Sequence, residues 1–193
     1  PFYQIYEGAA LLAGAEPVYL DCDPAAGYLP DLDAVDAATW SRCQVLFLCT
    51  PGNPTGAVMP APYLRRVLEL SDRFGFVVAS DEAYTELWFE EPPASALQLA
   101  DRTNVVVFNT LSKRSSMTGY RSGFAAGDPA LIAALKAFRP SVGTAPQEFV
   151  QRASVAAWND EAHVEETRAV YARKRKLFLD LFSSNGVRVA GSD

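Results

Sequence analysis

The sequence predicts an α/β fold in which helices cover a mostly parallel sheet. Segments with helical periodicity alternate along the chain with short apolar runs of strand length. One of these runs, Val45–Cys49, is apolar at every position, which is typical of a strand covered on both faces. Turn and capping residues separate the segments, as at Gly75 after a helical pattern and at Asp128 before one.

The expected elements follow this alternation from one end of the chain to the other. Helices are placed where apolar residues recur at helical spacing, and strands where a short apolar run lies between turn residues. The first half is expected to contain a helix at Tyr3–Ala13 ending at Gly14, a strand at Pro17–Leu20, a helix capped by Asp31 and reaching about Thr39, a strand at Val45–Cys49 and a helix at Pro60–Phe74 ending at Gly75. The second half is expected to contain strands at Phe76–Ala79, Asn104–Phe108 and Ser122–Ala126, a helix at Leu131–Phe138 capped by Asp128, a helical region at 148–182 broken around Trp158–Asp160, and a strand starting at Val187–Val189.

The composition is that of an ordinary globular protein and excludes several function classes. Hydrophobic residues make up 49% and charged residues 21%, so disorder is not expected. The net charge of −6 argues against nucleic acid as a partner. No apolar run approaches the roughly 20 residues of a membrane span, and no secretory signal is visible. We therefore expect a cytoplasmic protein with no membrane or nucleic-acid partner.

The chain has too few cysteines and histidines to favour a zinc site or a Ser-His-Asp catalytic triad. Cys22, Cys43 and Cys49 are widely spaced, without a Cys-x-x-Cys pair, which fits a reducing compartment. His163 is the one histidine and lies in a polar helical stretch, where we expect a surface residue. No metal site is expected.

Polar side chains follow three separate apolar runs, at the point where each predicted strand ends. Asn53 follows the first run, Asp81 the second and Lys113 the third. In open parallel sheets, ligands bind beyond the carboxyl ends of the strands. If the three strands are parallel neighbours, the amide, the carboxylate and the amine gather at one edge.

Each of these residues also has a purely structural interpretation. Asn53-Pro54-Thr55-Gly56 is a suitable turn sequence, Asp81 could cap a following helix, and Lys113 could be a solvated loop lysine. Turn and cap chemistry does not explain why the three groups recur at the same predicted edge. We therefore favour a shared binding function.

The set matches the chemical needs of one cofactor. An amine at a crevice forms Schiff bases with carbonyl compounds, and a carboxylate opposite a heteroaromatic nitrogen keeps that nitrogen protonated. Hydroxyls and an arginine near the lysine, here Thr110, Ser112 and Arg121, can hold a phosphate dianion. These requirements describe pyridoxal 5′-phosphate.

The motifs resemble those of the class I and II aminotransferases. The segment 112–124 (SKRSSMTGYRSGF) is similar to the family's cofactor-lysine segment, and Asn53–Gly56 and Asp81–Tyr84 match two further motifs in the expected order. The steps of 28 residues from Asn53 to Asp81 and of 8 from Lys113 to Arg121 also suit the family. The resemblance implies fold type I, a three-layer α/β/α domain that is incomplete at both ends of this chain.

The resemblance also implies a role for each site residue. Lys113 would form the Schiff base and shuttle the proton of the substrate, Asp81 would pair with the ring nitrogen, and Asn53 and Tyr84 would hydrogen-bond the ring oxygen. Tyr3 aligns with the aromatic residue that stacks on the ring, although it could equally be a core residue of the first helix. The phosphate would be bound by Thr110, Ser112 and Arg121.

By the same analogy, residues 1–143 form the major part of the large cofactor-binding domain, and residues 144–193 form a linking helix and the start of the small domain. The composition change at 139–146 agrees with this boundary. Both ends lie inside or beside expected elements, so we expect a segment of a longer, homodimeric protein. The family's other portions supply further phosphate contacts, dimer contacts and a substrate-binding arginine, so we expect the segment alone to be inactive.

Within the family, three segments are similar to succinyldiaminopimelate transaminases of lysine biosynthesis. They are residues 1–16, Ser112–Ser115 and Ala156–His163. The implied reaction transfers an amino group between glutamate and N-succinyl-2-amino-6-oxopimelate. Another class I or II aminotransferase, a C–S β-lyase and the cofactor-sensing domain of a transcription regulator remain alternatives.

Overall fold

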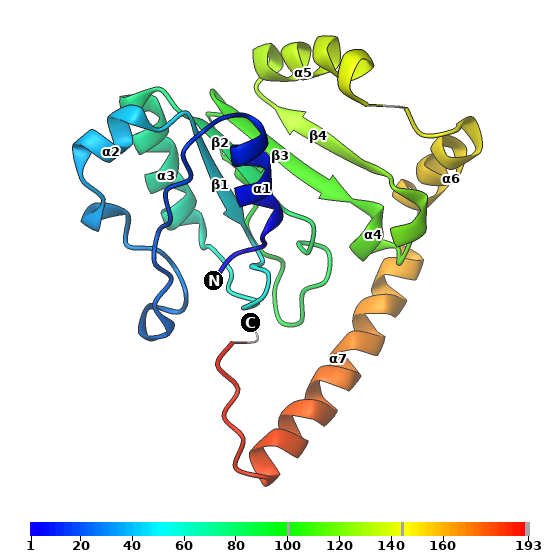
Figure 1. The fold of residues 1–193 in the computed structure, drawn as a ribbon. Coiled ribbons are helices and arrows are strands. Elements are labelled where there is room, and N and C mark those ends of the chain that lie inside the picture. Colours follow the sequence, from blue (N-terminus) through cyan, green and yellow to red (C-terminus); the bar gives the residue numbers. More distant parts are fainter. Residues whose placement is uncertain (100, 144, 192–193) are drawn as a thin grey trace.

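The structure, a computed structural model, describes residues 1–99, 101–143 and 145–191. A four-stranded sheet of order β1-β2-β3-β4 forms its centre (Figure 1). The first three strands are parallel neighbours and β4 pairs with β3 antiparallel, which confirms the α/β class with a mostly parallel sheet. The strands are β1 (Val45–Cys49), β2 (Val77–Asp81), β3 (Val105–Thr110) and β4 (Gly123–Gly127).

Helices surround the sheet and extend beyond it. Among the helices of the described ranges, none combines the length and the apolar stretch needed to cross a bilayer. The α-helices are α1 (Ile5–Leu12), α2 (Ala37–Arg42), α3 (Ala61–Phe74), α4 (Leu111–Arg114), α5 (Pro129–Val142), α6 (Glu148–Trp158) and α7 (Ala162–Ser184). Short 3-10 turns lie at η1 (Pro24–Ala26), η2 (Leu32–Ala34), η3 (Ala96–Gln98) and η4 (Thr118–Tyr120).

The main core lies between one face of the sheet and helices α2 and α3. Apolar residues at helical spacing on α3 are buried, and Gly75 ends the helix in the left-handed conformation, as predicted. From α2, Trp40 stacks on Phe76, with the ring centroids 5.3 Å apart. Full burial of each large apolar side chain stabilises the fold by about 1.5–3 kcal/mol. The core includes Leu48, Leu64, Val67, Leu70, Val78, Val105 and Val107.

The opposite face of the sheet is covered by α1 at the β1 edge. Alternation along the strands places Phe47, Cys49, Asp81 and Phe108 on this face, and Asp81 is paired with both Cys49 and Phe108. Tyr6 of α1 stacks on Phe47, with ring centroids 5.2 Å apart and planes at 12°. Phe47 and Phe108 remain 39% exposed. Helix α1 therefore begins a second layer over the face that carries Asp81.

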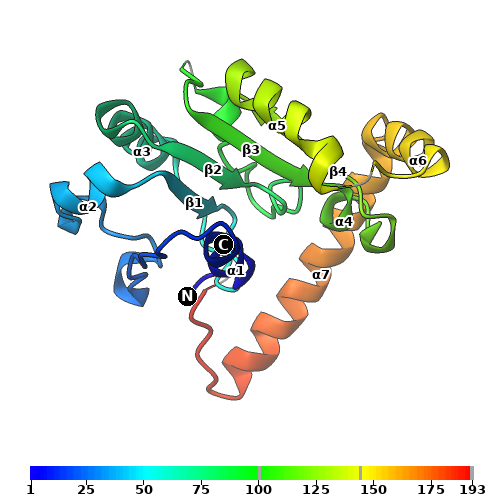
Figure 2. The ribbon, with the colours of Figure 1, turned by 45° about the horizontal axis from the view of Figure 1, so that its top comes forward.

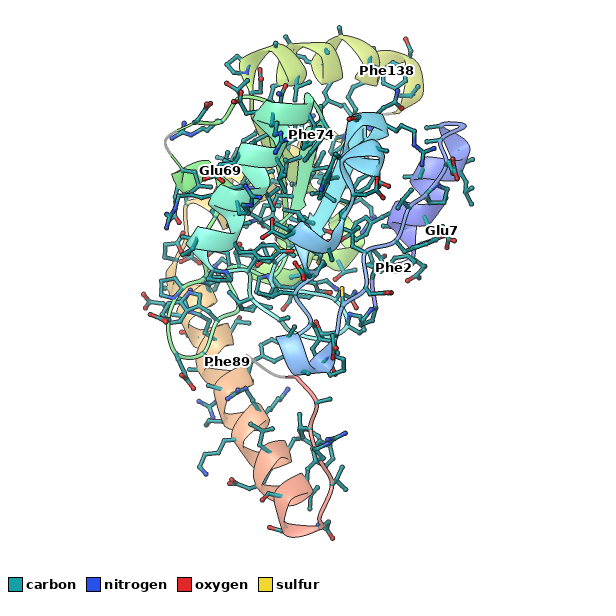
Figure 3. The ribbon with its side chains drawn as sticks, turned by 90° about the vertical axis from the view of Figure 1, so that its left-hand side faces the viewer. Phe2, Glu7, Glu69, Phe74, Phe89 and Phe138 are labelled. Carbon is teal, nitrogen blue, oxygen red and sulfur yellow. The ribbon has the colours of Figure 1, made fainter. Side chains whose placement is uncertain are left out.

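Helix α7 runs away from the sheet (Figure 2), and two of its arginines contact the segment that follows β2. Arg168 lies 4.6 Å from the ring of Trp88, and Arg175 lies 4.9 Å from the ring of Phe89. Figure 3 shows Phe89 beside this helix. The break expected near Trp158–Asp160 separates α6 from α7. The proposed domain boundary at residue 144 and the final residues 192–193 lie outside the described residues.

Several element predictions were wrong. Pro17–Leu20 and Val187–Val189 are not strands, because neither apolar run has a partner strand. Asp31 caps only the 3-10 turn η2, since the carboxylate of Asp36 accepts from the Thr39 amide and starts a separate helix, α2. The helix expected at Leu131–Phe138 is longer in the structure, and α5 contains Pro140.

Candidate active site

The carboxyl ends of the three parallel strands bring the predicted site segments to one edge of the sheet. Asp81 is the last residue of β2, between the ends of β1 and β3. Asn53 lies in the turn after β1, and Lys113 lies in α4, which directly follows β3. The parallel order that the sequence argument required is present, so residues far apart in the chain share one rim.

Two donors hold the carboxylate of Asp81. Its Oδ1 accepts a hydrogen bond from the amide of Ala83 at 3.1 Å, and its Oδ2 accepts one from the hydroxyl of Tyr6 at 2.6 Å. Burial and the hydrogen bond to Asp81 raise the pKa of Tyr6, so its hydroxyl stays protonated and donates. Because a carboxylate has about four acceptor positions, Asp81 keeps room for a further donor.

Tyr6 is a site residue that the sequence analysis missed. The signal was the sequence itself: Tyr6 follows Tyr3 by three residues, in the first turn of the helix that begins at Ile5. Their rings meet edge to face, with centroids 5.8 Å apart, and Tyr3 is 38% exposed. Tyr6 thus contacts the Asp81 carboxylate directly, and Tyr3 contacts the ring of Tyr6.

Lys113 and Tyr84 meet across the edge of the sheet. The ammonium nitrogen of Lys113 lies 5.3 Å from the ring centroid of Tyr84, within range of a cation–π contact. Both side chains are half-buried. Tyr84 follows Asp81 by three residues in the turn after β2, so the structure brings the predicted amine beside the predicted phenol.

The predicted phosphate-binding hydroxyls lie together where β3 passes into α4. Thr110 caps α4, accepting from the amide of Ser112 at 3.1 Å, and the two hydroxyl oxygens are 3.0 Å apart. Strand β4 starts directly opposite, with Gly123 paired to Thr110. Arg121 precedes that strand, but its guanidinium donates to the carbonyl of Thr118, at 3.0 Å, and its side chain is exposed. The side chains of Thr110 and Ser112 are therefore in direct contact. Arg121 is close to them in the fold because it precedes β4, but its side chain is hydrogen-bonded to the backbone of Thr118 instead.

Asn53 lies in a turn that is tightly held by hydrogen bonds. The amide of Gly52 donates to the carbonyl of Ala57 at 2.8 Å, and the amide of Met59 donates to the buried Thr50 hydroxyl at 3.0 Å. The peptide bond from Asn53 to Pro54 is cis. Asn53 also lines a hollow of about 690 Å³ between α1, the segment that follows it and β1. That hollow lies beside the Asp81–Lys113 edge, and neither Asp81 nor Lys113 lines it.

The histidine is not the simple surface residue that the sequence suggested. The His163 side chain is 29% exposed, and its two ring nitrogens lie 2.9 Å from an Asp160 carboxylate oxygen and 2.8 Å from the Ser115 hydroxyl. Ser115 is two residues after Lys113. Cys22, Cys43 and Cys49 are free thiols.

The donor set at this edge fits pyridoxal phosphate. The amine of Lys113 can bind an aldehyde, and the carboxylate of Asp81, kept in place by Tyr6, can face a protonated ring nitrogen. The adjacent hydroxyls of Thr110 and Ser112 can donate to a phosphate. An amine, a carboxylate and two hydroxyls that suit this cofactor therefore lie at the same end of the sheet.

Comparisons with known proteins agree with this geometry. The family model described as "Aminotransferase class I and II" matches residues 1–193. Among curated proteins, LL-diaminopimelate aminotransferase of Nitratidesulfovibrio vulgaris is 32% identical over 192 residues, which are 97% of this chain and 50% of that protein. LL-diaminopimelate aminotransferase of Desulforudis audaxviator is 34% identical, with 98% and 49% covered. The chain spans about half the length of these curated relatives.

Solved structures give the same result. An aminotransferase from Neisseria meningitidis has a TM-score of 0.87 and 42% identity, covering 91% of this chain and 46% of that one. A probable N-succinyldiaminopimelate aminotransferase from Thermus thermophilus has a TM-score of 0.82 and 31% identity, with 89% and 46% covered.

Proposed function

This chain belongs to the aminotransferase class I and II family, and from that premise we propose that the whole protein transfers an amino group between glutamate and an oxo acid. Its cofactor is pyridoxal 5′-phosphate. The observation that carries the proposal is the common edge of three parallel strands, which collects the carboxylate of Asp81 and the amine of Lys113. We further propose that the whole protein is a cytoplasmic homodimer.

The side chains divide the work of the reaction. The cofactor supplies, when bound, a carbonyl carbon that can carry an amino group and a ring that accepts electrons from the substrate. Asp81 holds a proton at the ring nitrogen, and Tyr6 fixes the Asp81 carboxylate by donating to its Oδ2. Lys113 would hold the cofactor through its amine and would move the proton at the substrate α-carbon.

The remaining site residues bind and orient. Tyr84, whose ring lies beside the Lys113 amine, would donate a hydrogen bond to the ring oxygen, and so would Asn53. Tyr3, which lies just before α1, would pack on the face of the ring. Thr110 and Ser112, whose hydroxyl oxygens are 3.0 Å apart, would bind the phosphate together with Arg121, which precedes β4.

We propose N-succinyl-2-amino-6-oxopimelate as the oxo acid. Two observations support this choice: the segments Ser112–Ser115 and Ala156–His163, and the similarity to the probable N-succinyldiaminopimelate aminotransferase of T. thermophilus. The names of the curated relatives favour a second candidate, the unsuccinylated oxo acid whose amination gives LL-diaminopimelate. Both candidates use the same edge of the sheet and differ only in the group carried by the distal amine.

Substrate profiling of the full-length protein tests the proposal. The cofactor-loaded protein is given 2-oxoglutarate with N-succinyl-LL-diaminopimelate, LL-diaminopimelate or other amino acids, and glutamate formation is measured. A higher kcat/KM for the succinylated donor supports the assignment, and preference for the free amine selects the second candidate. Release of pyruvate and ammonia from a cysteine thioether, without glutamate formation from any donor, would instead show a C–S β-lyase and contradict transamination.

A further inference from the structure

We propose that Arg114 is a positioning residue for this reaction, because its side chain holds the helical turn that carries Lys113 against the turn between α6 and α7. The inference rests on the proposed role of Lys113 and concerns how that amine is kept in place. It assigns a function to a charged side chain that is only 2% exposed and does not face the cofactor edge.

The turn that carries Lys113 cannot hold its own orientation. Helix α4 has four residues, Leu111–Arg114, and a single helical turn is unstable without tertiary contacts. Leu111 and Arg114 are three residues apart, so they share one face of the turn, and both are buried. Lys113 points elsewhere, toward the ring of Tyr84. The direction of the Lys113 amine therefore depends on what anchors Leu111 and Arg114.

Three groups from the α6–α7 turn anchor the guanidinium of Arg114. One of its nitrogens donates to the backbone carbonyl of Ala157 at 2.7 Å, and another donates to the carboxylate of Glu161. Its carbon lies 5.0 Å from the ring of Trp158. A flat guanidinium with five donors can satisfy a carbonyl, a carboxylate and an aromatic face together, whereas the ammonium of a lysine cannot stack in this way.

A second contact between the same two segments supports this anchor. The hydroxyl of Ser115, next along the chain, lies 2.8 Å from His163, whose other ring nitrogen lies 2.9 Å from Asp160. Strand β4 also reaches this region, where Phe124 packs edge to face on Trp158 at 5.1 Å. The α6–α7 turn is thus fixed to the sheet on one side and to the Lys113 turn on the other.

These contacts join two of the segments that the sequence analysis assigned to the same subfamily. Residues 112–115 and 156–163 lie 41 positions or more apart in the chain, yet the two segments touch. Arg114 contacts Ala157, Trp158 and Glu161. Ser115 contacts His163. A shared role in holding Lys113 accounts for the contact between them.

The test measures how Lys113 captures its cofactor, using the full-length protein freed of cofactor. Pyridoxal phosphate is added, samples are quenched with borohydride, and mass spectrometry follows the adduct at Lys113. The visible circular dichroism of the bound cofactor is recorded as well. Capture at Lys113 by the unmutated protein tests the proposed function separately, because its absence would refute the role of Lys113 whatever Arg114 does.

We expect Arg114→Met and Arg114→Lys to slow capture at least about tenfold and to change the dichroism, because a small displacement of a reacting group lowers the reaction rate strongly. Glu161→Gln keeps an oxygen that can accept a hydrogen bond from Arg114, so it should slow capture less than the two Arg114 substitutions do. Val67→Ala, in the core on α3 and 0% exposed, is the control that lowers stability without touching α4.

Two results would overturn the inference. One is capture and dichroism unchanged in both Arg114 variants. The other is a change in capture rate and dichroism that Val67→Ala reproduces when it lowers Tm by the same amount. That result would mean that Arg114 contributes only to stability. If Arg114→Met does not fold, Arg114→Lys, which retains the charge and the long side chain, carries the test alone.

Discussion

Replacing Tyr6 by Phe removes one hydroxyl and leaves the rest of α1 in place. The ring keeps its stacking on Phe47, but the Oδ2 of Asp81 loses the donor that lies 2.6 Å away. A hydrogen bond to a charged group is worth about 1.5–3 kcal/mol. Because Tyr6 and Asp81 are only half-buried, we expect the lower end, about 1.5 kcal/mol, which corresponds to a roughly tenfold weaker Kd for pyridoxal phosphate.

The assay is a titration of the cofactor-free, full-length protein with pyridoxal phosphate, followed by absorbance. Tyr19→Phe is the matched control, because Tyr19 donates to the Glu7 carboxylate in an exposed pair outside the site. The control should bind the cofactor as the unmutated protein does. An unchanged or tighter Kd in Tyr6→Phe would refute the reasoning, since it would mean that Tyr6 does not support Asp81 or competes with the cofactor for it.

Three further predictions follow from other parts of the structure. Lys113→Ala should abolish the absorbance band of the lysine-bound cofactor, whereas Lys136→Ala, at an exposed position on α5, should keep it; retention in the first variant would contradict the assignment. Burial raises the pKa of Glu82 above 4.5, so the folded protein binds more protons than the unfolded chain in the window above that value, and stability falls as pH rises there. The Tm of Glu82→Gln relative to that of the unmutated protein should therefore rise as the pH increases above about 4.5, and a difference that does not change with pH would contradict this. Gly123→Ala should lower stability by about 1–3 kcal/mol in a denaturant titration, because a Cβ would lie 2.3 Å from the carbonyl oxygen of Asn109; an unchanged midpoint would exclude that clash.

Local rules were sufficient for much of the fold. Val45–Cys49 is a strand at its predicted bounds, and the helix that follows ends at Gly75, where only a residue tolerant of the left-handed conformation fits well. The common edge of Asp81 and Lys113 was also predictable, because parallel neighbouring strands must end on the same side.

The remaining features depend on contacts that local patterns do not contain. The hydrogen bond from Tyr6 to Asp81 joins residues 75 positions apart and exists because α1 lies over the second face of the sheet. The run Pro17–Leu20 has the apolar character of a strand, but a strand also needs a neighbour to pair with. Similarly, the environment of His163 could not be inferred without knowing that Ser115 lies next to it.

A crystal structure of the full-length protein loaded with pyridoxal phosphate would test the central claim most directly. We predict electron density continuous from the side-chain nitrogen of Lys113 to the cofactor, with the ring nitrogen about 2.7–3.0 Å from a carboxylate oxygen of Asp81. A cofactor joined to a different lysine, or a ring nitrogen that faces away from Asp81, would contradict the account.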